Sequence, residues 1–74
     1  MSFAKLRGRI REMFATQAKF ANAMGMNTAT LSAKLNGKTE WSRDEIENAC
    51  YLLKIPPTEV AEYFFNNKIA ITQL

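Results

Sequence analysis

The sequence predicts a small all-α domain built from five helices. Apolar residues recur at helical spacing in successive short segments, which is the pattern of amphipathic helices. Only three Gly and two Pro occur in 74 residues, and they stand where those helices would end. The length allows one domain, and the 47% of hydrophobic residues is enough for one packed core.

The first two helices are expected on either side of residue 15. The first should run from about Phe3 to Met13, where one apolar stripe comprises Phe3, Leu6, Ile10, Met13 and Phe14. The second should begin near Thr16, because its hydroxyl can accept from a free backbone N–H of the first turn. Gly25 should end it, since glycine adopts the left-handed conformation at low cost.

The third helix is expected from about Thr28 to Leu35, capped by Asn27 or Thr28 and stopped by Asn36-Gly37. Its outer face carries short, nearly uncharged side chains. A short exposed helix that follows another after a tight turn has the form of a helix-turn-helix, whose second helix can enter the DNA major groove.

The fourth helix has the clearest start signal, a capping box formed by Ser42 and Glu45. Trp41 and Ile46 are placed as a hydrophobic staple across that start. Pro56-Pro57 ends the helix and opens a fifth one that should extend to about Phe65, because proline is tolerated in a first turn. The remaining residues, 68–74, alternate weakly and are expected to be extended.

Charge is distributed unevenly along the chain. Residues 1–38 contain seven Lys and Arg and a single acidic residue, Glu12. Residues 39–74 contain three Lys and Arg and six Asp and Glu. The basic half contains the expected helix-turn-helix, and this combination is the electrostatic pattern of a nucleic-acid binder. The alternative is a solvated surface with uneven charge.

Several classes of function are disfavoured by what the sequence lacks. Without His there is no imidazole base and no His metal ligand, and the single Cys50 forms neither an internal disulfide nor a zinc site. The three glycines are scattered, so no phosphate-binding loop is expected. We therefore expect no enzyme, cofactor, metal or small-molecule substrate. We also expect no membrane segment and no signal peptide, and a reducing, cytoplasmic compartment.

Residues 17–37 resemble the helix-turn-helix of lambdoid phage Cro and repressor proteins. The shared features are Gln17, Ala21, Gly25, Leu31 and the closing Asn36-Gly37. The whole chain is also similar to small phage-encoded Cro-like proteins in its GRI…F opening, its KLNGK stretch and its PP-x-E-V…YFF ending. The resemblance implies a five-helix, lambda-repressor-like DNA-binding domain with the helix-turn-helix in helices 2 and 3.

The same resemblance implies the residues that would contact DNA. Base contacts would come from Asn27, Thr28, Ala29, Ser32 and Ala33. Backbone contacts would come from Gln17, Lys19, Lys34, Asn36, Lys38 and Arg43. The implied function is a sequence-specific transcriptional repressor that reads the major groove of a pseudo-palindromic, double-stranded operator.

Such a site calls for a homodimer, because one half-site binds weakly. Residues 1–66 should form the DNA-binding domain, and the tail, residues 67–74, is a candidate for dimerisation. The dimer surface is expected at Tyr63, Phe64, Phe65, Ile69 and Ile71, although these aromatics could equally close the core.

The alternative function is a protein-interaction regulator on the same helical scaffold, of the anti-repressor or antitoxin kind. Such a protein would use an apolar patch around Tyr63 and Phe65, and it would tolerate changes at Thr28. A DNA reader would instead need Thr28 to Ala33 exposed between basic side chains.

Overall fold

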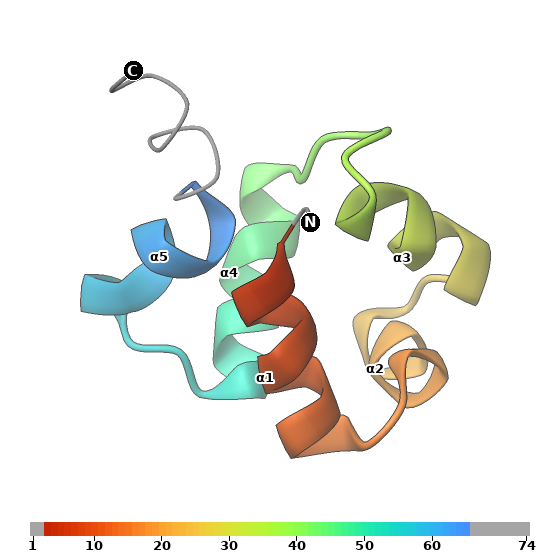
Figure 1. Cartoon of the computed structure of the whole chain (residues 1–74), viewed down its shortest axis with the longest axis horizontal. Coiled ribbons are helices and arrows are strands. Elements are labelled where there is room, and N and C mark those ends of the chain that lie inside the picture. The colour runs from red at the N-terminus through yellow and green to blue at the C-terminus, as the bar shows by residue number, and fades with distance from the viewer. Residues whose placement is uncertain (1–2, 66–74) are drawn as a thin grey trace.

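The computed structural model describes residues 3–65, which form five α-helices, one short 3-10 helix and no strand. The helices are α1 (Ala4–Phe14), α2 (Gln17–Met24), α3 (Thr28–Leu35), α4 (Arg43–Leu53), the 3-10 helix η1 (Pro57–Glu59) and α5 (Val60–Phe64). Figure 1 shows α2 and α3 on one side of α1 and α5 on the other. The predicted all-α class is confirmed. The expected tail, residues 67–74, lies outside the described residues.

The caps of α2 and α3 follow the sequence prediction. The Thr16 hydroxyl accepts a hydrogen bond from the Lys19 backbone N–H at 3.1 Å, and Gly25 ends α2 with a φ of 77°. The Asn27 side chain accepts from the Thr30 backbone N–H at 2.7 Å. Asn27 rather than Thr28 is therefore the N-cap of α3.

The start of α4 is the expected capping box. The Ser42 hydroxyl accepts from the Glu45 backbone N–H at 3.1 Å, and the Glu45 carboxylate accepts from the Ser42 backbone N–H at 2.8 Å. Two backbone donors of the first turn, which have no partner within the helix, are thereby satisfied.

The fifth helix is shorter than predicted. Pro57 opens the 3-10 helix η1, in which the Glu59 N–H donates to the Pro56 carbonyl oxygen at 2.9 Å. Glu59 has a φ of −112° and a ψ of 1°, outside the α-helical region, and α5 begins only at Val60. The proline pair therefore yields two short helical turns instead of one continuous helix.

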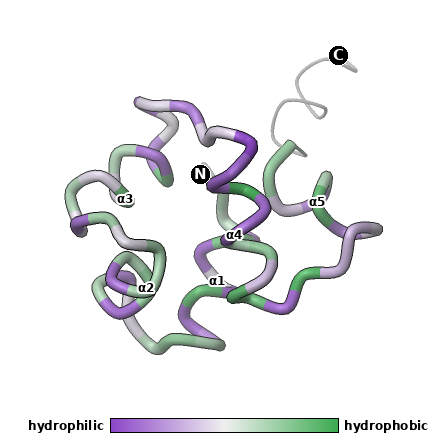
Figure 2. Tube along the Cα trace, turned by 180° about the vertical axis from the view of Figure 1, so that it is seen from behind, coloured by the Kyte–Doolittle hydropathy of each residue, from purple (hydrophilic) through white to green (hydrophobic). Residues whose placement is uncertain are grey.

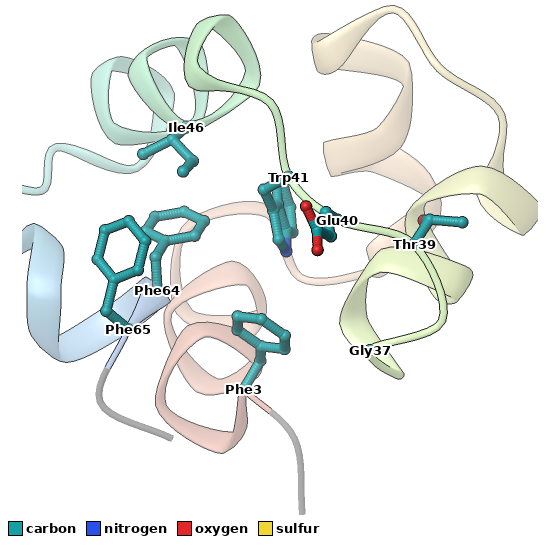
Figure 3. Close-up of a pocket in the computed structure, with 8 residues that line it drawn as sticks. All are labelled: Phe3, Gly37, Thr39, Glu40, Trp41, Ile46, Phe64 and Phe65. Carbon is teal, nitrogen blue, oxygen red and sulfur yellow. The ribbon is translucent and has the colours of Figure 1, made fainter. Parts of the chain in front are cut away.

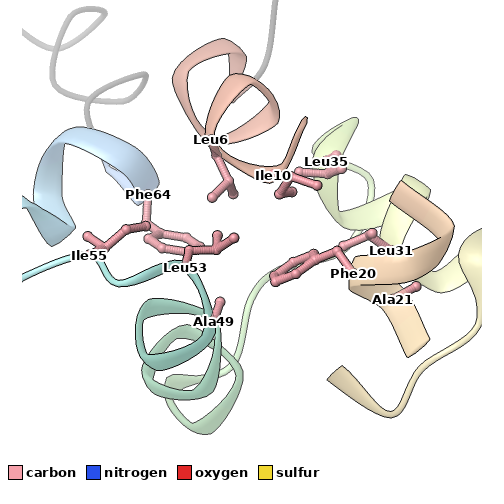
Figure 4. Packing of buried hydrophobic residues seen from close by; sticks show 10 residues of the cluster. All are labelled: Leu6, Ile10, Phe20, Ala21, Leu31, Leu35, Ala49, Leu53, Ile55 and Phe64. Carbon is pink, nitrogen blue, oxygen red and sulfur yellow. The ribbon is translucent and has the colours of Figure 1, made fainter. Parts of the chain in front are cut away.

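All five α-helices contribute side chains to a single core. Its buried members are Leu6, Ile10, Phe20, Ala21, Leu31, Leu35, Ala49, Leu53, Ile55 and Phe64. Figure 4 shows these side chains converging between the helices, with Phe20 entering from α2. Ile55 was not predicted as a core residue because it lies after the last turn of α4. Lys54, with a φ of 56°, turns the chain so that Ile55 points inward.

Candidate functional site

The outer face of α3, predicted to contact DNA bases, is only partly accessible. Thr28 and Ala29 are exposed, whereas Ser32 and Ala33 are half-buried. Asn27 is exposed, but its side-chain oxygen caps α3. The structure thus presents the first turn of α3 to solvent more than its second turn.

The residues predicted to contact the DNA backbone are spread over several elements. Lys19, Lys38 and Arg43 are exposed. The Arg43 guanidinium is paired with Glu47 at 3.3 Å, one turn further along α4. Gln17 is half-buried at the start of α2 and lines a shallow, partly basic hollow of α1 and α2.

Lys34 does not have the exposed position that a phosphate contact requires. It is 8% exposed, and its ammonium group donates to the Glu40 carbonyl oxygen at 3.0 Å. The same ammonium lies 3.0 Å from a Glu45 carboxylate oxygen. The Lys34 side chain turns inward because the Glu40 carbonyl oxygen and the Glu45 carboxylate both accept from its ammonium. Its predicted exposed position, as a contact of the DNA backbone, is therefore wrong.

Asn36 is also used within the fold. Its side-chain oxygen accepts from the Arg7 guanidinium at 2.7 Å, and its amide lies 3.4 Å from the Ser32 hydroxyl. Arg7 additionally donates to the Leu35 carbonyl oxygen at 2.9 Å. Asn36 itself is exposed, and the end of α3 is held by a cation of α1.

A second surface gathers aromatic side chains around an open hollow, which we call the aromatic pocket. Its volume is about 330 Å³, and it is lined by Phe3, Gly37, Thr39, Glu40, Trp41, Ile46, Phe64 and Phe65. Figure 3 shows the rings of Phe3, Trp41, Phe64 and Phe65 grouped around it, with Ile46 on α4 above them. Phe65 is 43% exposed. The pocket thus combines a packed aromatic floor with an accessible rim.

Trp41 is the centre of this aromatic group. Its ring meets Phe64 edge to face, with centroids 5.1 Å apart and planes at 79°. Phe3 packs against it in the same manner at 6.3 Å and 61°. Such pairs add about 0.5–1.5 kcal/mol beyond their buried area. The indole nitrogen is buried without a hydrogen-bond partner within the described residues, and a buried unpaired donor is rare in folded proteins.

One charged side chain, Glu40, lines the aromatic pocket. It is exposed, and the described residues offer its carboxylate no ion pair. The nearby Lys5 is not available as a free cation, since it pairs with Glu62 and lies over the Tyr63 ring at 4.9 Å. The hollow is therefore apolar, with one acidic group at its edge.

The apolar members of this pocket could be singled out from the sequence, but not as one group. Phe3 was assigned to the first apolar stripe, Trp41 and Ile46 to a staple, and Phe64 and Phe65 to a dimer surface or the core. Tyr63 and Phe65 were named as the patch that a protein binder would use. Residue 3, residues 37–46 and residues 64–65 are far apart in the sequence, so only the fold brings them together.

The described residues offer little for other chemistry. They contain no group of three or more His, Cys, Asp or Glu side chains that could hold a metal ion. Burial raises the pKa of the half-buried Cys50 thiol, which disfavours its reactive thiolate. Within residues 3–65, no helix has the length and apolar character needed to cross a membrane.

Comparison with known proteins identifies a matching family and a similar solved structure. The model of a family described as "Protein of unknown function (DUF739)" matches residues 1–67. Among solved structures, the chain is similar to the modulator of repression (MOR) of the temperate bacteriophage TP901-1 from Lactococcus lactis. The two share 43% sequence identity over 88% of each chain, with a TM-score of 0.78. No curated protein matches.

These findings correct the expectation drawn from lambdoid Cro and repressor proteins. The solved relative is called a modulator of repression, and the matching family is a different one. The assignment to the Cro/repressor family is therefore wrong, as is the DNA-binding repressor function that followed from it. The findings favour the alternative, a protein-interaction regulator on a helical scaffold. By its match over residues 1–67, the chain belongs to the family described as "Protein of unknown function (DUF739)".

Proposed function

We propose that this chain is a regulator of phage type that modulates repression by binding a repressor protein. The observation that carries the proposal is the aromatic pocket, an accessible apolar hollow in a chain whose solved relative is named a modulator of repression. Protein interfaces are centred on aromatic side chains that sit in desolvated pockets, and those side chains supply most of the binding energy.

The occupant of the pocket is an apolar side chain of the repressor. Four aromatic rings line the hollow, so it has apolar surface to offer but only one charged group, Glu40. A basic residue of the repressor beside that apolar side chain would meet the Glu40 carboxylate. Apolar contact would then supply most of the affinity, and the charge would favour one orientation.

The basic half of the chain has a structural explanation that supports this proposal. Arg7 holds the end of α3, Arg9 holds the end of α4, and Lys34 is buried and donates to the Glu40 carbonyl oxygen. Three of the seven cations in residues 1–38 are thus engaged with carbonyl groups of the fold.

In its finer detail, we propose that the scaffold is a lambda-repressor-like arrangement in which α2, the turn 25–27 and α3 form a helix-turn-helix. The caps at Thr16 and Asn27 and the left-handed Gly25 support that assignment. A shared scaffold does not fix a shared ligand, because function resides in the side chains of the site.

The test titrates the full chain with the purified repressor encoded in the same genome, by calorimetry. Phe65→Ser removes the exposed rim of the aromatic pocket and, because Phe65 is 43% exposed, little of the core. We expect this variant to bind about thirtyfold more weakly, as for loss of an interface hot spot of about 2 kcal/mol.

Tyr51→Ser is the matched control. Tyr51 is 81% exposed and is not one of the residues that line the aromatic pocket. The Tyr51→Ser variant should bind the repressor like the wild type. Thr28→Glu should do so too, because it adds a carboxylate at the N-terminal end of α3, where the helix dipole favours negative charge. Equal loss in Phe65→Ser and Tyr51→Ser, or no binding by the wild type, would refute the proposal. Sedimentation of the chain alone would show whether the pocket instead joins two copies.

A further inference from the structure

One wall of the aromatic pocket is the connection between α3 and α4. Gly37, Thr39, Glu40 and Trp41 all belong to it and line the hollow. Figure 2 shows this connection as largely hydrophilic up to the start of α4. Its first part is fixed by the end of α3, since the Lys38 N–H donates to the Ala33 carbonyl oxygen at 2.9 Å.

Beyond Lys38 the connection has few supports of its own. No backbone–backbone hydrogen bond among residues 3–65 involves Thr39, Glu40 or Trp41. Side-chain contacts therefore position this segment, and those of the Trp41 ring with Phe3 and Phe64 are among them.

Lys34 is the side chain that reaches its backbone from α3. The ammonium group donates to the Glu40 carbonyl oxygen at 3.0 Å and pairs with Glu45 at 3.0 Å. That carboxylate accepts from the Ser42 backbone N–H at 2.8 Å. The Lys34–Glu45 pair is thus bound to the backbone on both sides of Trp41, at residue 40 and at residue 42.

Stability is a weak reason for a lysine in this position, whose side chain is 10% exposed and whose partner Glu45 is 29% exposed. Replacing a buried ion pair by apolar side chains of similar size is often neutral or stabilising, because desolvating two charges offsets their attraction. An ammonium that donates to a carbonyl and a carboxylate in fixed directions does restrict geometry more than an apolar contact would.

We propose that Lys34 is a positioning residue for the aromatic pocket: together with Glu45 it fixes the backbone around Trp41 and so shapes the surface that receives the partner. This inference rests on the proposed function for the identity of the partner. Its geometric part concerns the pocket alone and can be tested without any partner.

Trp41 provides the signal, because the sequence contains one Trp. Its fluorescence emission and its quenching by acrylamide report how tightly the ring is held and shielded. In Lys34→Met, which keeps the volume but removes the ammonium, we expect the emission to shift to longer wavelength. We expect the quenching of Trp41 by acrylamide to rise about twofold. We expect the affinity of this variant for the repressor to fall about tenfold, as for loss of a charged hydrogen bond.

Arg9→Met is the matched control. Arg9 also ties a cation to carbonyl oxygens, those of Leu53 and Lys54, at 2.9 and 3.3 Å. These lie at the far end of α4 from the capping box, so this variant should lose stability while its Trp41 emission, quenching and affinity stay at wild-type values.

The outcomes separate the two proposals. Wild-type emission and quenching in a folded Lys34→Met would overturn the positioning role, whatever the repressor does. A changed Trp41 signal without any change in repressor affinity would support that role but refute the pocket as the docking site. If Lys34→Met does not fold, Lys34→Gln, whose amide ends one bond short of the ammonium, is measured in the same way and judged by the same criteria.

Discussion

Ala15 joins α1 to α2 in a backbone conformation that favours glycine. Its φ is 72° and its ψ is −45°, and the Thr16 N–H donates to the Phe14 carbonyl oxygen at 2.8 Å. These values describe a γ-turn of the positive-φ form, which is rare and strained. Ala15 is exposed, so removing its methyl group opens no buried cavity. We therefore predict that Ala15→Gly stabilises the fold.

The size of the effect follows from two opposing terms. A side chain at positive φ costs about 1–2 kcal/mol compared with a right-handed conformation. Glycine in place of alanine loses about 0.5–1 kcal/mol more on folding, because its unfolded chain is freer. The net stabilisation is therefore about 0.5–1 kcal/mol, which in a domain of this size raises Tm by about 3–6 °C.

Thermal unfolding followed by circular dichroism measures this shift. Ala18→Gly is the control, because the same chemical change falls within α2 at an exposed position. It should lower the free energy of unfolding by about 0.5–1 kcal/mol, since glycine is a poor helix former. Opposite signs for the two variants would support the strained turn at Ala15. A lower Tm in Ala15→Gly would refute the reasoning.

Three further predictions concern the core and the ends of α4. The Phe20 side chain has no exposed surface, so Phe20→Ala should lower the free energy of unfolding in urea by about 3–5 kcal/mol. A decrease below about 1 kcal/mol would contradict the packing in Figure 4. Lys54 has a φ of 56°, so Lys54→Gly should raise the free energy of unfolding by about 0.5–1 kcal/mol in the same assay. A decrease would contradict this expectation. The Ser42 backbone N–H lowers the pKa of Glu45, so the stability that Glu45 contributes is present above about pH 4.3 and is lost as pH falls through its lower folded pKa. Tm measured against pH should therefore fall more steeply in acid for the wild type than for Glu45→Gln, and parallel curves would contradict this.

The local structure was largely predictable because its causes lie within a few residues of each other. Caps at Thr16 and Ser42 require only a hydroxyl and a backbone N–H about three residues away. Gly25 ends α2 for a reason that belongs to glycine itself. Ala15 and Lys54, in contrast, adopt positive φ without a sequence signal. Each stands at the end of a helix, where the chain turns toward the next element.

The candidate site was less predictable because it depends on contacts between distant segments. Phe3, Trp41 and Phe64 meet only once α1, the α3–α4 connection and α5 have packed together. The position of Lys34 could not be inferred either, since spacing along α3 does not indicate that Glu40 and Glu45 lie within 3.0 Å of its ammonium. A lysine at that position predicts an exposed charge by default.

The error in the first functional assignment has a physical origin in those contacts. Charge counted along the sequence treats every cation as available to a ligand, whereas Arg7, Arg9 and Lys34 each donate to backbone carbonyl oxygens of the fold. A phosphate competing for Lys34 would have to displace the Glu45 carboxylate and the Glu40 carbonyl oxygen from its ammonium, and the backbone at residue 40, beside Trp41, would lose that contact. Lys34, one of the residues predicted to contact the DNA backbone, is therefore coupled to the aromatic pocket. For a fold of this kind, the partners of each cation are a better guide to the ligand than the net charge of the segment that carries it.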